Sequence, residues 1–137
     1  MHKTFYCIVG CGNLGSRLAK SLSEKGQEVL IIDKDKKKFG KLGQNFSGLA
    51  VEGDATDLKF ISEFDIEKAK VLIAVTREDN VNLMICQIAR EFFGVKVIAR
   101  LYNSEKESVY RTFGIDIICP DELTEAAINL KLSEAIA

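Results

Sequence analysis

FYCIVGCGNLG, residues 5–15 of a 137-residue chain, joins an apolar run to a glycine-rich loop. The run 5–9 is typical of a strand that is buried on both faces of a sheet, and Gly10 stops it. Gly10, Gly12 and Gly15 match the pattern GxGxxG, and apolar residues at helical spacing follow from Asn13 onward. A strand, a glycine loop and a helix in this order predict the first unit of a Rossmann-type α/β domain.

Each glycine has its own expected role in a nucleotide-binding loop. The first permits a tight turn, the second lets the backbone approach a pyrophosphate, and the third lets helix and strand pack closely. Cys11, Asn13 and Leu14 complete the loop. The helix that begins there offers free N–H groups and a partial positive charge to a phosphate. A strand–helix turn without any ligand is the alternative interpretation.

Short apolar runs alternate with amphipathic stretches along the whole chain. We expect strands at 5–9, 28–32, 48–51, 70–75, 95–99 and 115–119, and helices at 13–25, 36–42, 56–64, 78–93, 104–113 and 121–137. This alternation predicts a doubly wound, six-stranded parallel Rossmann sheet in the order 3-2-1-4-5-6, with a ligand crevice where strands 1 and 4 diverge. Residues 1–120 are the expected nucleotide-binding domain, and residues 121–137 are its C-terminal helix.

Asp33 stands at the end of the second expected strand. A carboxylate there accepts hydrogen bonds from ribose hydroxyls and repels a 2′-phosphate, which favours NAD(H) or a plain adenosine nucleotide over NADP. Lys34 weakens this preference, because a cation shields a 2′-phosphate. The alternative is that Asp33 is the N-cap of the following helix.

Polar residues also follow the later strands. Gly53, Asp54 and Ala55 end strand three beside the expected adenine pocket, where Asp54 either accepts from the adenine amino group or closes an Asx turn. Thr76 and Arg77 follow strand four, near the ribose or the phosphates. Arg100 ends strand five and either contacts a phosphate or pairs with an acid at a subunit boundary.

Composition argues against several classes of protein. A net charge of −1 does not predict a nucleic-acid-binding surface. No apolar run reaches the roughly 18 residues that span a bilayer, and the first residues do not resemble a signal peptide. Four widely spaced cysteines without a CxxC pair predict reduced thiols, no structural metal and a cytoplasmic protein. His2, the single histidine, argues against histidine-based catalysis.

Several stretches, taken in order, resemble the RCK domain, also called KTN or TrkA-N. They are residues 10–15, 29–33, 51–56, 74–82, 98–100 and 113–120. The resemblance covers nearly the whole chain. It implies a cytosolic regulatory subunit that binds NAD(H), ATP, ADP or AMP and catalyses no reaction of the nucleotide. Such subunits form homodimers or larger rings and gate a membrane-embedded potassium channel or transporter of the Trk/Ktr type, at which they lie peripherally.

The resemblance also implies that the helix after Pro120 crosses to a partner subunit. Leu123, Ala126, Ala127, Leu130 and Ala135 would form its apolar face. The alternative is that this helix folds back on its own domain. Family members often continue into a second, smaller ligand-binding domain beyond this point.

Two positions depart from the family pattern. Asn13 stands where many members have an arginine that reaches a terminal phosphate, so discrimination between ATP and ADP is not predicted. Asp121 stands where many members have a glutamate that helps to hold a cation near the phosphates. The acidic charge is therefore kept on a shorter side chain.

The main alternative function is an NAD-dependent oxidoreductase or a fragment of one. Such an enzyme needs a substrate-side acid or base such as His, Lys or Tyr, usually on a further domain, and residues 121–137 contain no histidine or tyrosine. A redox-sensing or DNA-linked repressor would need a basic recognition helix, which the sequence does not predict.

Overall fold

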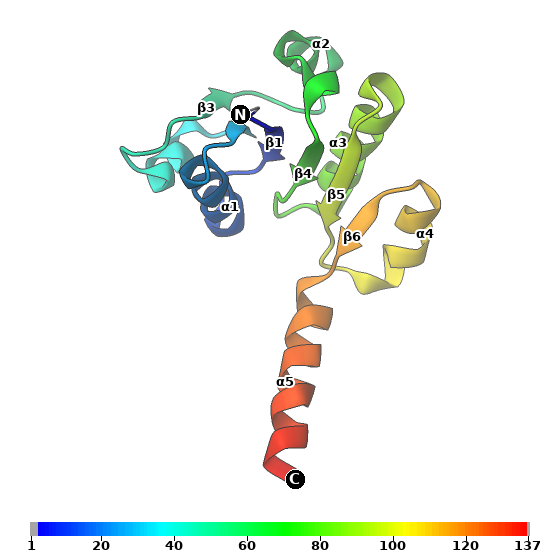
Figure 1. The fold of residues 1–137 in the computed structure, drawn as a ribbon. Helices are drawn as coiled ribbons and strands as arrows, with labels where there is room; N and C mark the ends of the chain where they lie inside the picture. Colours follow the sequence, from blue (N-terminus) through cyan, green and yellow to red (C-terminus); the bar gives the residue numbers. More distant parts are fainter. Residues whose placement is uncertain (1–2, 137) are drawn as a thin grey trace.

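Six parallel strands form the central sheet, in the order β3-β2-β1-β4-β5-β6 (Figure 1). The structure is a computed structural model that describes residues 3–136, so His2 lies outside the described residues. The strands are β1 (Phe5–Val9), β2 (Glu28–Asp33), β3 (Leu49–Glu52), β4 (Val71–Ala74), β5 (Lys96–Arg100) and β6 (Asp116–Ile118). The predicted order and the doubly wound topology are confirmed.

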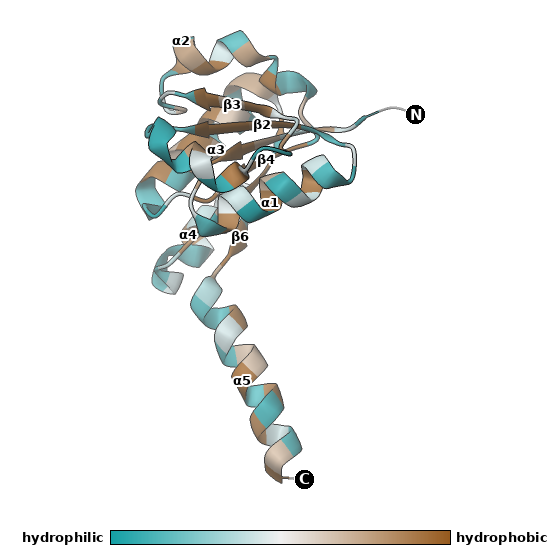
Figure 2. Cartoon of the chain, turned by 90° about the vertical axis from the view of Figure 1, so that its left-hand side faces the viewer, coloured by the Kyte–Doolittle hydropathy of each residue, from teal (hydrophilic) through white to brown (hydrophobic). Residues whose placement is uncertain are grey.

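Helices cover the two faces of the sheet unequally. α1 (Asn13–Glu24) and the 3₁₀ helix η1 (Lys36–Leu42) lie on one face, over β1 and β2. α2 (Leu58–Ile61), α3 (Asp79–Phe93) and α4 (Glu107–Thr112) lie on the other, over the larger core cluster. Figure 2 shows the strands as the most hydrophobic part of the chain, as expected for a sheet buried between helices.

Two predicted helices differ from expectation in type. The helix at 36–42 is a 3₁₀ helix, begun by Asp35, whose side chain accepts from the Lys37 N–H at 3.0 Å. The helix at 56–64 is split into α2 and the 3₁₀ turn η2 (Ser62–Phe64), and a further turn, η3 (Ile66–Lys68), was not predicted. Asp65 has a left-handed backbone, with φ of 49°, and interrupts the helical path there.

The helix at 104–113 also begins as a 3₁₀ turn, η4 (Ser104–Lys106), before α4. Asn103 caps this turn by accepting from the Glu105 N–H at 3.1 Å. The sequence pattern located the helical segments at 36–42, 56–64 and 104–113, but apolar periodicity alone does not distinguish a 3₁₀ turn from an α-helix.

The last helix, α5 (Pro120–Ile136), extends away from the sheet (Figure 1). Pro120 occupies its first turn, where a missing N–H removes no helical hydrogen bond, so Pro120 starts the helix rather than separating it from β6. Residues 121–136 are all exposed, and the helix does not fold back on its own domain. Residue 137, the last of the predicted helix, lies outside the described residues.

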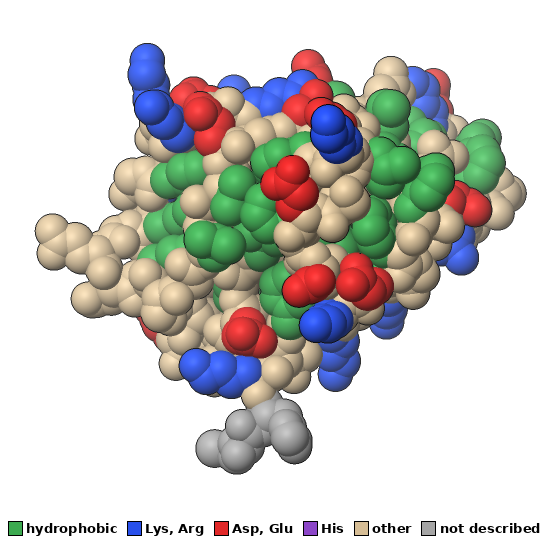
Figure 3. All heavy atoms as spheres, turned by 90° about the horizontal axis from the view of Figure 1, so that it is seen from above, with side chains coloured by type: hydrophobic (Ala, Val, Ile, Leu, Met, Phe, Trp, Pro, Cys, Tyr) green, Lys and Arg blue, Asp and Glu red, His purple; other side chains and the backbone are tan. Residues whose placement is uncertain are grey.

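The helices in residues 3–136 are all too short or too polar to cross a bilayer. Viewed from above, acidic and basic side chains are interspersed among hydrophobic ones (Figure 3). On that face, neither sign of charge forms a continuous field of the kind that nucleic-acid binding uses.

Candidate functional site

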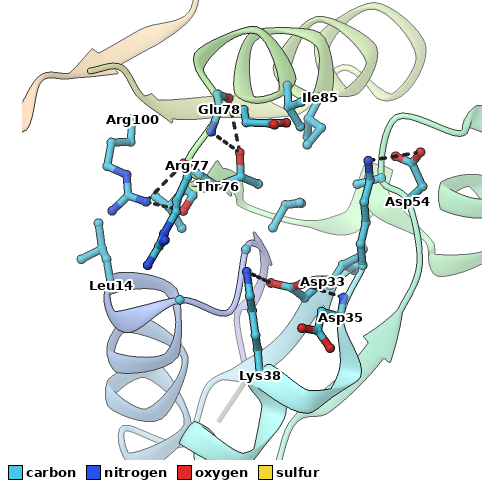
Figure 4. A pocket seen from close by; sticks show the side chains of 18 of the residues that line it. Leu14, Asp33, Asp35, Lys38, Asp54, Thr76, Arg77, Glu78, Ile85 and Arg100 are labelled. Atoms are coloured by element: carbon cyan, nitrogen blue, oxygen red, sulfur yellow. Dashed lines mark hydrogen bonds and ion pairs between the residues drawn. The ribbon is translucent and has the colours of Figure 1, made fainter. Parts of the chain in front are cut away.

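A pocket of about 430 Å³ opens at the carboxyl ends of the central strands, where β1 and β4 diverge (Figure 4). This is the switch point at which open α/β sheets bind ligands, and the volume is typical of a small-molecule site. Most predicted site residues line it: Gly10, Gly12, Asn13, Leu14, Asp33, Lys34, Gly53, Asp54, Ala55, Thr76, Arg77 and Arg100. Cys11 and Gly15 do not.

The glycine loop leaves its backbone accessible from the pocket. Gly10 has a φ of 108°, and a Cβ there would lie 2.9 Å from the Val75 carbonyl carbon. A Cβ on Gly15 would overlap the Gly10 carbonyl oxygen, so this glycine is needed for close packing of helix and strand. A Cβ on Gly12 would meet no protein atom within 4 Å and would project into space that a ligand can use.

The amino end of α1 retains its capacity to bind an anion. Its N-cap is Gly12, which has no capping side chain, and the first turn contains no acidic residue. The orphan N–H groups and the positive end of the helix dipole are therefore available to a phosphate.

Asp33 is 8% exposed and connects the glycine loop to η1. One carboxylate oxygen accepts from the Cys11 N–H at 2.7 Å, and the other accepts from the Asp35 N–H at 2.8 Å. The Lys38 ammonium lies 3.9 Å from Asp33 (Figure 4). Asp35, not Asp33, is the N-cap of η1, so the capping interpretation of Asp33 is wrong. Each oxygen can still accept a further hydrogen bond, for example from a ribose hydroxyl.

Cys11 contributes its backbone rather than its thiol. The side chain is completely buried and its Sγ lies 3.5 Å from the Lys38 carbonyl oxygen. Burial, followed by the nearby Asp33 charge, raises the pKa of the Cys11 thiol. A buried thiol with a raised pKa is poorly reactive, which favours a small filling residue over an oxidisable one.

Asp54 forms the Asx turn that the sequence left open. Its Oδ1 accepts from the Thr56 N–H at 2.9 Å and from the Thr56 hydroxyl at 2.6 Å. The hydroxyl bond is the largest cause of the lowered pKa of Asp54. Lys34 lies 3.8 Å from the second oxygen (Figure 4). Because Asp54 also lines the pocket, its contact with adenine stays a prediction.

A buried amide holds the opposite wall of the pocket. Asn82 on α3 is 0% exposed and accepts from the Thr76 N–H at 2.9 Å and from the Thr76 hydroxyl at 2.6 Å. Its amide nitrogen donates to the carbonyl oxygens of Thr76, at 3.1 Å, and Arg100, at 2.9 Å. Sequence reasoning did not assign Asn82 a role. The available signal was a polar residue within the apolar face of a helix.

Arg100 reinforces the same wall. It donates to the carbonyl oxygens of Val75, at 2.7 Å, and Thr76, at 3.2 Å, and lies over the Tyr102 ring at 4.9 Å. Among the described residues Arg100 has no acidic partner, and its buried Nε has no hydrogen-bond partner. Its charge is therefore left uncompensated at the pocket edge. Figure 4 shows Arg77 extending across the pocket mouth toward α1.

Further lining residues were not predicted as site residues. They are Val9, Ile32, Asp35, Lys38, Lys41, Val75, Glu78, Val81, Ile85 and Tyr102. The apolar members have the periodicity of core residues, so the sequence could not separate them from the rest of the core. Acidic side chains line the pocket as well, and two of them pair with Lys34 and Lys38. Lys41, Arg77 and Arg100 have no such partner among the described residues, and these three cationic groups favour an anionic ligand.

One group of side chains elsewhere has metal-ligating chemistry. The ligand atoms of Glu107, Cys119 and Glu122 lie within 4.8 Å of one another at the base of α5. Arg111 pairs with Glu107 at 2.5 Å, and desolvation followed by the Glu107 charge raises the pKa of Glu122. Arg111 already neutralises Glu107, the less exposed of the two carboxylates, so we assign no metal to this group.

Comparison with protein families matches residues 6–120 to the TrkA-N domain. The Trk system potassium uptake protein TrkA of Streptomyces coelicolor is 40% identical over 112 residues, which are 81% of this chain and 50% of that protein. The TrkA homolog of Methanothermobacter thermautotrophicus is 32% identical over 128 residues, which are 93% of this chain and 59% of that protein. The chain thus spans between half and three-fifths of these curated relatives.

Solved structures share the fold. The NAD(P)-binding domain of an exopolyphosphatase-related protein from Archaeoglobus fulgidus has a TM-score of 0.81 at 25% identity, covering 94% of this chain and 97% of that one. The GsuK channel bound to NAD has a TM-score of 0.73 at 17% identity, and the match covers 87% of this chain and 22% of the GsuK chain. GsuK bound to ADP has the same TM-score and identity, and the match covers 86% of this chain and 31% of that GsuK chain. At this identity the GsuK likeness shows the fold alone.

Proposed function

This chain belongs to the TrkA-N domain family, and on that premise we propose that it is a regulatory module that binds an adenine nucleotide at the loop Gly10–Gly15. The open space beside Gly12, facing the uncapped amino end of α1, is the observation that carries the proposal. A backbone without a Cβ at this point admits a phosphate group to the helix N–H donors.

The other pocket residues fit the remaining parts of such a nucleotide. Asp33 offers carboxylate oxygens to the ribose, and Asp54 lies where the third strand ends, beside the expected adenine. Arg77, Arg100 and the lysines around the pocket offset phosphate charge. The candidates are NAD(H), ATP, ADP and AMP. In this assignment the nucleotide is a signal and supplies no chemistry.

In the whole protein, binding would control a membrane potassium channel or transporter from its cytoplasmic side. The names of the TrkA relatives support this partner. The exposed apolar residues of α5 support a contact with a second copy of the chain, as a homodimer or within a larger ring. Nucleotide exchange would then change the geometry of the assembly.

An NAD-dependent oxidoreductase remains the alternative, because such enzymes share the fold. The pocket lining in the described chain holds no histidine, the commonest general acid or base, and the Asp33 carboxylate already accepts hydrogen bonds from the Cys11 and Asp35 N–H groups. We therefore favour sensing over hydride transfer.

Thermal unfolding with NADH, ATP, ADP and AMP tests the proposal. A ligand at about a hundred times its Kd stabilises the folded state by about 2.7 kcal/mol, so at least one nucleotide should raise the melting temperature in a concentration-dependent way. Unchanged melting with all four would refute nucleotide sensing. Oxidation of bound NADH by small carbonyl compounds, followed by its absorbance, would favour the oxidoreductase instead.

A further inference from the structure

Basic and acidic residues are distributed unequally along the chain. Residues 1–48 contain nine lysines and arginines and four acidic residues, whereas residues 49–137 contain ten and sixteen. The basic segment includes α1 and η1, which lie at the β3 end of the sheet, and the acidic segment includes α4 and α5, at the β6 end (Figure 1). A chain with a net charge near zero is therefore polar as a whole, and such an asymmetry is typical of proteins that meet a charged surface.

The excess of basic charge is concentrated on α1 and η1, which pack against each other. Two nearby lysines, Lys34 and Lys38, pair with Asp54 and Asp33. Five further basic side chains on these helices have no ion-pair partner within residues 3–136, and four of the five are exposed. We call these five residues the lysine face: Arg17, Lys20, Lys36, Lys37 and Lys41.

The winding of η1 decides which way its lysines point. Residues three apart lie in one row along a 3₁₀ helix. Phe39 and Leu42 form the row that packs on the core, and Lys38 and Lys41 form the row that lines the nucleotide pocket. Lys37 lies in the third row and is exposed. Because its apolar row is already packed, η1 can lie against a charged surface but has no free apolar side chain to insert into one.

The basic residues of α1 lie beside those of η1. Burial raises the pKa of the Cys11 thiol, whereas the charges of Lys41, Lys38 and Lys20 oppose this rise. All three ammonium groups are therefore near the same thiol, which lies against the backbone of η1 at the Lys38 carbonyl oxygen. Arg17 stands one turn before Lys20, on the same side of α1. The two helices thus form one continuous basic surface.

We propose that the lysine face binds the surface of a membrane that contains anionic phospholipids. This inference rests on the proposed placement of the chain beneath a membrane transporter, and it names the side of the molecule that faces the bilayer. Four of the five members are lysines, whose point charges need no fixed partner geometry. They suit a diffuse field of headgroup phosphates better than a single bound anion.

The acidic residues of α5 give the contact a direction. This helix has four acidic residues and one lysine, so an anionic surface repels it while attracting the lysine face. Each basic residue near such a surface strengthens binding roughly fivefold, and salt weakens the attraction. The contact is peripheral, because no apolar residue of η1 is free to enter the bilayer.

Cosedimentation with lipid vesicles tests the proposal. We expect the chain to bind vesicles of phosphatidylcholine mixed with phosphatidylglycerol at low salt, to dissociate as salt is added, and to ignore vesicles of phosphatidylcholine alone. The double variant Lys36→Gln/Lys37→Gln should weaken binding at least about tenfold. Both residues are exposed and neither lines the nucleotide pocket.

The matched control is Lys59→Gln/Lys70→Gln. These two lysines are also exposed, lie outside the pocket lining and have no ion pair within the described chain, so the loss of charge is the same. Vesicle binding should remain within about twofold of wild type, because the substituted lysines are not on the lysine face. Equal weakening by the two double variants would show that only net charge matters and would overturn the inference.

Orientation is measured with a gadolinium-chelating lipid in the same vesicles. The amide signals of Lys36 and Lys37 should broaden, and those of Glu125 and Glu134 on α5 should stay sharp. Broadening confined to α5 or to the outer face of α3 would assign the membrane to another side. Binding to double-stranded DNA or to polyglutamate, but not to the anionic vesicles, would assign another class of partner and likewise overturn the inference.

The melting temperature with nucleotides is measured on the same samples. If the vesicles are not bound but nucleotides still stabilise the chain, the membrane contact is wrong and nucleotide sensing stands. If vesicles are bound as expected but no nucleotide stabilises the chain, the sensing role fails and the lipid surface stands. The two failures are therefore distinguishable.

Discussion

The three loop glycines differ in what surrounds them. Gly15 touches the Gly10 carbonyl and has no room for a Cβ, whereas Gly12 faces open space and has an ordinary backbone, with φ of −77°. Both positions are glycine, but for different physical reasons. At Gly15 the reason is the close packing of helix on strand, and at Gly12 it is the approach of a ligand.

Substitution by alanine separates these reasons. We expect Gly12→Ala to leave the melting temperature of the free protein nearly unchanged but to abolish stabilisation by nucleotides. We expect Gly15→Ala to cost about 3 kcal/mol of folding free energy, because backbone must move to admit the methyl group. Chemical denaturation with and without nucleotide measures both. Full nucleotide binding by Gly12→Ala would show that the loop does not cradle the ligand.

Asp33 is expected to set the preference against a 2′-phosphate. The wild-type chain should bind NADH more tightly than NADPH, because the nearly buried carboxylate repels the extra phosphate. Asp33→Asn removes the charge at constant size, and we expect the ratio of the two affinities to fall about tenfold or more. Isothermal titration calorimetry gives the ratio. Asp65→Asn, an exposed residue paired with Lys68, is the control. An unchanged ratio in Asp33→Asn would remove the assigned role.

At the scale of elements, the long periodic segments were predictable, whereas the 3₁₀ type of the short helices and the turn η3 were not. β1 matches its predicted bounds, and α3 begins one residue later than expected. The region between β3 and β4 differs because Asp65 adopts a left-handed conformation that no sequence pattern specified. Short turns depend on local hydrogen bonds more than on apolar spacing.

The site was predictable only in part for a related reason. Polar residues that stand at or just after the end of a strand, such as Asp33 and Arg77, can be recognised in the sequence. Asn82 lies one turn inside a helix, and its four hydrogen bonds become visible only when β4 and β5 are placed beside it. Apolar wall residues such as Ile85 serve the core and the pocket at once.

Asn82 should therefore matter to stability and to the site together. Asn82→Ala leaves the buried partners at Thr76 and Arg100 unpaired, and we expect a loss of about 3 kcal/mol in the free energy of unfolding, with weaker nucleotide binding. Asn80→Ala, an exposed position on the same helix, should change either quantity little. Urea denaturation measures the first effect. Equal effects of the two substitutions would contradict the role of Asn82 in joining β4 to β5.

At the scale of the whole molecule, the sheet order followed from the alternation of strands and helices and from the handedness of crossovers. The position of α5 could not follow from those rules, because residues 121–136 are all exposed and do not pack on the sheet. The helix extends from the same edge of the sheet that carries the pocket (Figure 1). The proposed nucleotide and the proposed partner thus meet the molecule at neighbouring places, which gives a physical route for one to influence the other.

An amide NMR titration with ADP tests directly whether an adenine nucleotide binds at the glycine loop. We predict saturable shifts at the amides of Gly12, Asn13, Lys34, Ala55 and Arg77, and none on the outer face of α3. The same titration of Gly12→Ala should show no saturable shifts. Absence of shifts in the wild-type chain with ADP, and with NADH, ATP and AMP in turn, or shifts confined to another surface, would contradict the account.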